Sequence, residues 1–112
     1  MTPNDFRRIA LGMEGAVEGA HMAHPDFRVN GRIFATISPD AKSGMVSLTP
    51  EQQQEFIRAD PATFVPAAGA WGRGGSTMVR LATADADTVG EAMTLAWQAT
   101  VKKKPVSRKA RR

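Results

Sequence analysis

The stretch Phe27-Arg28-Val29-Asn30-Gly31-Arg32-Ile33-Phe34-Ala35-Thr36-Ile37 decides the fold of this chain. Two runs rich in β-branched and aromatic residues flank the pair Asn30-Gly31. Both residues of a two-residue type I′ turn need a positive φ, which Asn and Gly tolerate, so the stretch predicts a hairpin. Its register pairs Val29 with Arg32, Arg28 with Ile33 and Phe27 with Phe34. Large apolar side chains then lie on both faces of the hairpin. We therefore expect one face to pack against the core and the other face to be partly covered.

Helix-start signals lie on either side of this hairpin. Thr2-Pro3 is a hydroxyl N-cap followed by a proline at the first helical position, and it predicts a helix over 3–13. Thr49-Pro50 repeats the signal with Gln52 as the reciprocal capping partner, and it predicts a helix over 50–59.

The last helix carries the longest apolar stripe. Apolar residues recur at helical spacing from the turn at 84–88 up to Val101, with Trp97 as the expected core anchor. Besides the hairpin, short strands are predicted over 16–22, 45–48, 64–68 and 76–81. This order predicts an α+β fold, a mostly antiparallel sheet of five or six strands with three helices packed on it, in a single domain over 1–101.

Composition excludes several classes of protein. The 112 residues are 42% hydrophobic and 23% charged, which fits one packed domain. The chain has no cysteine, so disulfide frameworks, thiolate metal sites and cysteine nucleophiles are excluded. The sequence shows neither a secretory signal nor an apolar run of the ~20 residues that a membrane helix needs. We therefore expect a cytoplasmic protein without membrane contact.

The positive charge is concentrated at the C-terminus. Seven basic residues fall within the last eleven positions: Lys102, Lys103, Lys104, Arg108, Lys109, Arg111 and Arg112. Residues 1–101 hold eight basic and eleven acidic residues, a net charge of −3. We expect 102–112 to be a flexible basic tail, and it serves either as a nucleic-acid arm or as a solubilising terminus.

The glycine-rich segment from Gly69 to Ser76 has the length of a phosphate-binding loop but lacks its chemistry. Gly75 occupies the position of the essential lysine, and a predicted strand rather than a helix follows. Two interpretations stay open. The segment is a flexible connection, or it is a recognition loop on which Trp71 and Arg73 stack on and neutralise a nucleotide.

His21 and His24 are the only histidines. On one strand this spacing puts the two rings on opposite faces, so we expect neither a metal ion nor another cofactor. No serine stands in a nucleophile elbow, and the sequence assigns no catalytic residue.

Several segments resemble the MmcQ/YjbR family. They are His24-Pro25-Asp26-Phe27-Arg28-Val29-Asn30-Gly31-Arg32-Ile33-Phe34-Ala35-Thr36, Leu48-Thr49-Pro50-Glu51-Gln52, Phe64 with Pro66 and Trp71-Gly72, and Ala96-Trp97 in the closing helix. The resemblance covers about residues 3–104. It implies an α+β fold compared with secretion chaperones and with the double-wing motif of a phage transcription factor. The second likeness is the reason that family members are labelled DNA-binding.

Three functions are considered, in this order. The first is a DNA-binding or nucleic-acid-associated module that contacts phosphates through Arg28, Arg32, Arg73 and Arg80, with added affinity from the basic tail. The second is a protein-interaction or chaperone-like module that presents a sheet face. The third is a small-ligand binder or an enzyme built around a pocket of His24, Asp26, Arg28 and Trp71.

The first hypothesis depends on one geometric expectation. The hairpin and the glycine-rich segment must bring the guanidinium groups of Arg28, Arg32 and Arg73 to a common exposed surface, with carboxylates clear of it.

Overall fold

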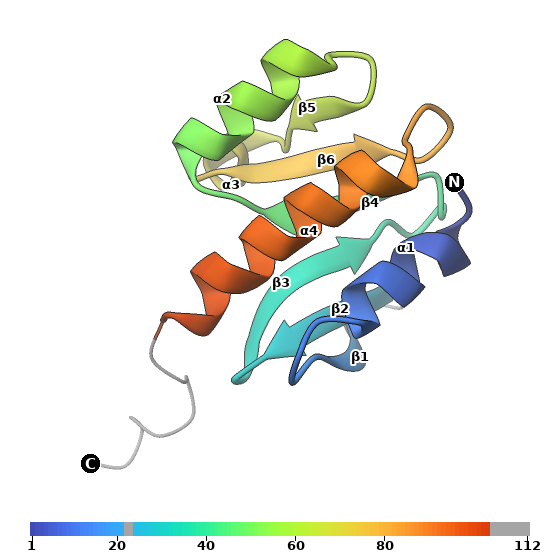
Figure 1. The fold of residues 1–112 in the computed structure, drawn as a ribbon, viewed down its shortest axis with the longest axis vertical. Coiled ribbons are helices and arrows are strands. Elements are labelled where there is room, and N and C mark those ends of the chain that lie inside the picture. The colour runs from blue at the N-terminus through green and yellow to red at the C-terminus, as the bar shows by residue number, and fades with distance from the viewer. Residues whose placement is uncertain (22–23, 104–112) are drawn as a thin grey trace.

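Six strands form one sheet in the order β1-β2-β3-β4-β6-β5, and every neighbouring pair is antiparallel (Figure 1). The computed structural model describes residues 1–21 and 24–103, with His21 described through its backbone. The strands are β1 (Val17–His21), β2 (His24–Val29), β3 (Arg32–Ile37), β4 (Ser43–Ser47), β5 (Phe64–Pro66) and β6 (Ser76–Arg80). The predicted α+β class and antiparallel sheet are confirmed.

Three long helices lie on one face of this sheet (Figure 1). Helices α1 (Pro3–Leu11) and α4 (Ala86–Val101) pack against β3 and β4, and α2 (Pro50–Ala59) packs against β5 and β6. A fourth helix, α3 (Gly69–Arg73), is a short segment that contacts β6. Within the described ranges, no helix combines the length and the apolar character needed to cross a membrane.

The predicted N-cap at Thr2 and the predicted capping box at Thr49 are both present, and Thr2 also forms a capping box. The Thr2 hydroxyl accepts a hydrogen bond from the Asp5 amide at 3.1 Å, and the Asp5 carboxylate accepts one from the Thr2 amide at 2.9 Å. Thr49 and Gln52 make the same reciprocal pair. The Asp85 carboxylate caps α4 by accepting from a first-turn amide at 3.0 Å. These hydrogen bonds favour the ionised form, so they hold the pKa of Asp5 and the pKa of Asp85 below the ordinary carboxyl value.

The β2–β3 turn has the predicted type. Asn30 has a φ of 55° and Gly31 a φ of 78°, both in the left-handed region that a type I′ turn requires. The first two residue pairs beyond this turn follow the predicted register.

The predicted pairing of Phe27 with Phe34 is wrong. Phe27 pairs with Ala35, so β3 carries one extra residue, Phe34, in a β-bulge. Regular alternation would place Phe34 and Ala35 on opposite faces of the sheet, yet both are completely buried in the same core. The bulge therefore lets β3 bury a phenylalanine beneath the helices.

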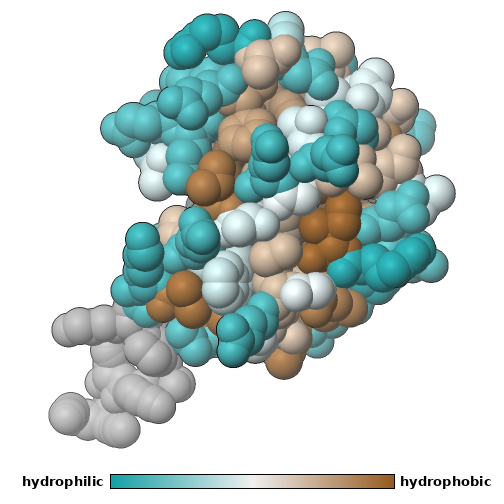
Figure 2. Space-filling model, viewed as in Figure 1, coloured by the Kyte–Doolittle hydropathy of each residue, from teal (hydrophilic) through white to brown (hydrophobic). Residues whose placement is uncertain are grey.

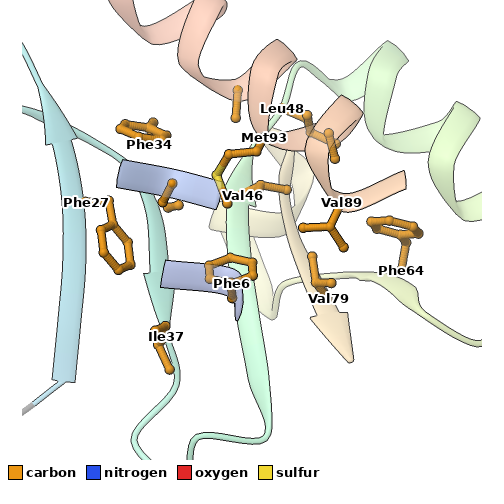
Figure 3. Close-up of a cluster of buried hydrophobic side chains, with 14 of the residues drawn as sticks. Phe6, Phe27, Phe34, Ile37, Val46, Leu48, Phe64, Val79, Val89 and Met93 are labelled. Atoms are coloured by element: carbon orange, nitrogen blue, oxygen red, sulfur yellow. The ribbon is translucent and has the colours of Figure 1, made fainter. Parts of the chain in front are cut away.

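The core lies between the sheet and the long helices (Figure 3). Its largest completely buried apolar side chains are Phe6, Phe27, Phe34, Phe64, Met93, Val46, Val79 and Val89. Trp97, the expected core anchor, is partly buried against this cluster, and its indole Nε1 donates to the Glu14 carbonyl at 2.8 Å. It therefore joins α4 to the connection that follows α1.

Two further sequence-based predictions are wrong. The segment expected as a loop contains α3, so the described part of the chain has four helices rather than three. His21 and His24 do not share a strand, because His21 ends β1, His24 begins β2, and the register pairs them across the two strands. The described residues hold no group of three or more potential metal ligands.

The sheet face opposite the helices carries a cross-strand row of half-buried side chains. Thr36 pairs with Met45, Met45 with Met78, and Met78 with Val65. Each of the four is half-buried, and each alternates along its strand with residues of the helix-covered face. This row lies on the sheet face that the protein-interaction hypothesis considers.

Gly44 of β4 lies directly against the core ring of Phe6, and a Cβ added at Gly44 would collide with that ring. We therefore expect Gly44→Ala to lower the free energy of unfolding by about 1–3 kcal/mol. A Cβ added at Gly90 on α4 would meet open space, so Gly90→Ala should raise the same free energy by about 0.5–1 kcal/mol. Urea denaturation followed by circular dichroism measures both values. A Gly44→Ala variant as stable as the wild type would contradict the described packing.

Candidate functional site

A groove of about 750 Å³ opens at the end of the sheet where the β2–β3 hairpin turns. It is lined by Arg28, Gly31, Arg32 and Ile33 of the hairpin, by Ser47, Leu48, Thr49 and Pro50 after β4, by Ala70, Trp71, Gly74 and Ser76 around α3, and by Ala99, Thr100 and Lys103 at the end of α4. The described lining thus holds three cationic side chains and no carboxylate.

The groove forms where β3 and β4 separate. Their pairing ends at Ala35 and Val46, whereas the hairpin continues to Arg32. The separation begins at the bulge residue Phe34, and a bulge bends its strand and increases the local twist. Figure 1 shows β3 curving along its length. The residue that fills the core therefore also turns the hairpin tip away from β4.

The hairpin wall of the groove is built on a bidentate ion pair. Nε and Nη2 of Arg28 donate to the two carboxylate oxygens of Asp26 at 2.8 and 3.0 Å. Asp26 is completely buried, whereas the Arg28 side chain is 38% exposed. The hydrogen bond to Asp26 raises the pKa of Arg28 above its ordinary value. Gly19 on β1 leaves room for this pair, because a Cβ there would lie 3.0 Å from Asp26 Oδ1.

Helix α3 forms another wall, and Gln53 of α2 holds it in place. The buried Gln53 side chain donates through Nε2 to the carbonyls of Gly72 and Ser76, both at 3.0 Å. Gly72 packs so closely that a Cβ would collide with the Ala67 carbonyl oxygen. These contacts fix α3 while the Trp71 side chain remains 78% exposed. An exposed aromatic side chain on a fixed backbone segment therefore lines the groove.

The structure brings together two of the four predicted arginines. Arg28 and Arg32 both line the groove. Arg73 lines a neighbouring hollow beside α2, and Arg80 is exposed at the far end of β6. The expectation of one carboxylate-free surface for the first three is wrong in two respects. Arg73 lines a different hollow, and Arg28 is paired with Asp26.

The residues of the predicted pocket are also divided. Arg28 and Trp71 line the groove, and Asp26 supports Arg28. His24 lies at the opposite end of β2 from the hairpin turn, outside the described lining of the groove.

The predicted basic tail begins at the groove. Lys103 lines it, and Lys102 is the exposed C-cap residue of α4. Cations at a helix C-terminus also offset the helix dipole, so these two lysines stabilise α4 as well. Lys104, Arg108, Lys109, Arg111 and Arg112 lie outside the described residues.

Gln53 is the functional residue that sequence reasoning missed. A signal for it exists: it lies three and four positions before Phe56 and Ile57, the apolar residues of α2. A polar residue on the docked edge of a helix needs a hydrogen-bond partner, which here is the backbone around α3.

The sequence model of the YjbR family matches residues 11–99, a range that includes the hairpin, α3 and most of α4. The fold is that of an α+β domain with helices on one face of an antiparallel sheet. The chain belongs to the YjbR family. The resemblance noted from the sequence is confirmed. No curated protein matches the sequence.

The fold is similar to that of a solved structure, the Deinococcus radiodurans protein DR2400, which is described with a DUF419 domain. The TM-score is 0.77, with 97% of this chain and 86% of that chain covered. The sequence identity is 21%, so this likeness establishes the fold.

Replacing Arg28 removes two hydrogen bonds from a completely buried carboxylate. Arg28→Gln should therefore lower the melting temperature by about 10 °C or more, and Arg28→Lys should lower it less because the charge remains. Arg80→Gln, at an exposed arginine, should lower it by about 2 °C or less. Thermal unfolding at neutral pH measures all three. Equally small shifts for Arg28→Gln and Arg80→Gln would show that Asp26 does not depend on Arg28.

Proposed function

We propose that this YjbR-family protein binds nucleic acid, with the phosphate backbone held in the groove by Arg28, Arg32 and Lys103. The tail residues Lys104, Arg108, Lys109, Arg111 and Arg112 add sequence-independent affinity. The observation that carries the proposal is the charge of the groove. Its described lining has three cations and no carboxylate, although residues 1–101 have a net charge of −3.

The distribution of carboxylates supports this assignment. A second hollow, of about 740 Å³, lies between α2 and α4 and is lined by Glu55, Asp87 and Glu91. Two hollows of nearly equal volume therefore carry opposite charge. A phosphate chain is repelled from the acidic hollow and attracted to the groove, so a domain that is negative overall still presents a positive site.

The three groove cations have different roles. The charge of Arg28 is partly balanced by Asp26, and the ion pair also supports the hairpin wall. Arg32 and Lys103 are therefore the positions at which phosphate binding is tested without removing that ion pair.

A protein-interaction module is the second candidate, and the row from Thr36 to Val65 on the helix-free sheet face favours it. The large hydrophobic side chains that are exposed in the described residues are Leu11, Val17 and Trp71, which come from three different elements. On the helix-bearing face, hydrophobic residues lie in small groups among hydrophilic ones (Figure 2). Because the described apolar surface is divided in this way, we rank this candidate below nucleic-acid binding.

The groove supports binding more than catalysis. Its described lining has serine and threonine hydroxyls, which accept and donate hydrogen bonds, but neither a histidine nor a carboxylate. Histidine and carboxylate side chains are the ones that most often serve as general acids and bases.

The proposal is tested with the full chain and a tail-neutral variant, in which Lys104, Arg108, Lys109, Arg111 and Arg112 are all replaced by Gln. We expect the tail-neutral variant to bind a labelled oligonucleotide at low salt, with log K falling against log salt at a slope of roughly −2 to −3 for three groove cations. Adding Arg32→Glu and Lys103→Glu should weaken binding about tenfold or more, because two attractive charges become repulsive. Fluorescence anisotropy from about 50 to 300 mM salt measures these constants.

The matched control is Arg80→Glu in the tail-neutral chain, which makes, far from the groove, the same charge change as either groove substitution makes alone. It should alter affinity by about threefold or less. A tail-neutral chain that does not bind at low salt would assign all binding to the tail. Equal losses from Arg80→Glu and from the groove substitutions would show that net charge, not the groove, controls affinity.

A further inference from the structure

The most exposed large hydrophobic side chain in the described residues belongs to Trp71, and it lies beside cations. Its side chain is 78% exposed, against 59% for Val17 and 40% for Leu11. The groove that Trp71 lines also contains Arg28, Arg32 and Lys103. Burial within this domain does not explain an indole at this position, whereas a ligand with both a flat aromatic part and an anionic part would use it.

The backbone of helix α3 that carries this indole is held in place. The two hydrogen bonds from Gln53 and the close packing of Gly72 on Ala67 fix the backbone on either side of it. The Gly74 amide also donates back to the carbonyls of Ala70 and Trp71 at 3.0 and 3.2 Å. Because the backbone that carries the ring is already ordered, a ligand that stacks on Trp71 orders little further backbone. Less of the stacking free energy is therefore offset by lost conformational entropy.

We infer, on the basis of the proposed function, that the groove selects unpaired nucleic acid, with Trp71 stacking on a base and the hairpin cations holding the adjacent phosphates. In a duplex, the faces of the bases are covered by the neighbouring bases of the stack. A tryptophan therefore reaches a base face only in an unpaired strand. Duplex phosphates remain available to arginine and lysine, so charge alone would not distinguish the two forms.

The arrangement of the groove fits a ligand whose base stacks on Trp71 and whose phosphates contact the cations. Arg28 and Arg32 lie on the hairpin, Trp71 lies on α3, and apolar Ile33 and Ala99 line the same space. A nucleotide is polar along its backbone and apolar on its base face, so it matches a groove with cations on one element and an aromatic ring on another. The side chains of Ser47 and Ser76 supply hydroxyls for base edges or sugar groups.

The test measures binding of the full chain to labelled oligothymidine of about ten nucleotides, to a duplex of the same length, and to oligouridine. We expect the single strands to bind about tenfold more tightly than the duplex. Trp71→Ala and Trp71→Leu should each weaken single-strand binding by about tenfold to a hundredfold, while Trp71→Phe should weaken it only a few-fold because a ring remains. Duplex binding should change by about twofold or less in all three variants.

Two controls accompany the test. Leu11→Ala removes another exposed apolar side chain and should leave single-strand affinity unchanged. A 2-aminopurine placed within the single strand should lose fluorescence on binding wild-type protein and keep it with Trp71→Leu, which reports stacking directly. Circular dichroism of each variant verifies that the fold is retained.

Different outcomes separate this inference from the proposed function. Equal affinity for duplex and single strand, together with no effect of Trp71→Ala, would overturn the inference while leaving phosphate binding intact. Wild-type single-strand affinity in Trp71→Leu would show that an apolar contact is sufficient and that stacking is not needed. This result would also overturn the inference. Failure of the full chain to bind any of the three oligonucleotides at low salt would remove the proposed function itself. Tighter binding of both oligothymidine and oligouridine than of the duplex would support the inference for DNA and RNA single strands alike.

Discussion

The burial of Phe34 is the constraint on which the rest of this structure depends. One extra residue in β3 allows both Phe34 and Ala35 to enter the core beneath the helices. The same residue ends the pairing of β3 with β4 at Ala35 and turns the hairpin tip aside. The space between the separated strands becomes the groove, so a packing requirement in the core creates a concave site at the end of the sheet.

Two sets of hydrogen bonds keep the walls of the groove in place. The Arg28–Asp26 ion pair fixes the hairpin side, and the Gln53 amide fixes α3. Asp26 and Gln53 are buried polar side chains, and burying either of them without a hydrogen-bond partner would destabilise the fold. Each wall of the groove therefore depends on hydrogen bonds as well as on apolar packing. The consequence is a groove in which Arg28 and the backbone that carries Trp71 are ordered before any ligand arrives, and this lowers the entropic cost of binding.

Features decided by neighbouring residues could be predicted from the sequence. The Asn30-Gly31 turn, the N-cap at Thr2 and the capping box at Thr49 depend on backbone conformation over a few residues, and all three are present. The bulge could not be predicted, because it depends on the burial of Phe34 against helices distant in the chain.

The site was predicted less completely than the fold, for the same reason. Local composition predicts a loop at α3, but Gln53 and Ala67 hold the segment as a helix. In a loop, Trp71 and Arg73 could act together. In a helix, residues two positions apart do not share a face, and Arg73 lines a different hollow. The pairing of Arg28 with Asp26 likewise depends on side-chain geometry at the sheet rather than on spacing.

The central claim is that the groove opened by the bulge is where nucleic acid binds. The most direct measurement is a two-dimensional ¹H–¹⁵N spectrum of the full chain, titrated with single-stranded DNA of about ten nucleotides. The account predicts that the largest shifts occur at the amides of Gly31 and Arg32, at those of α3, and at the indole N–H of Trp71. Shifts confined to residues after Lys103, or to the row from Thr36 to Val65, would contradict it.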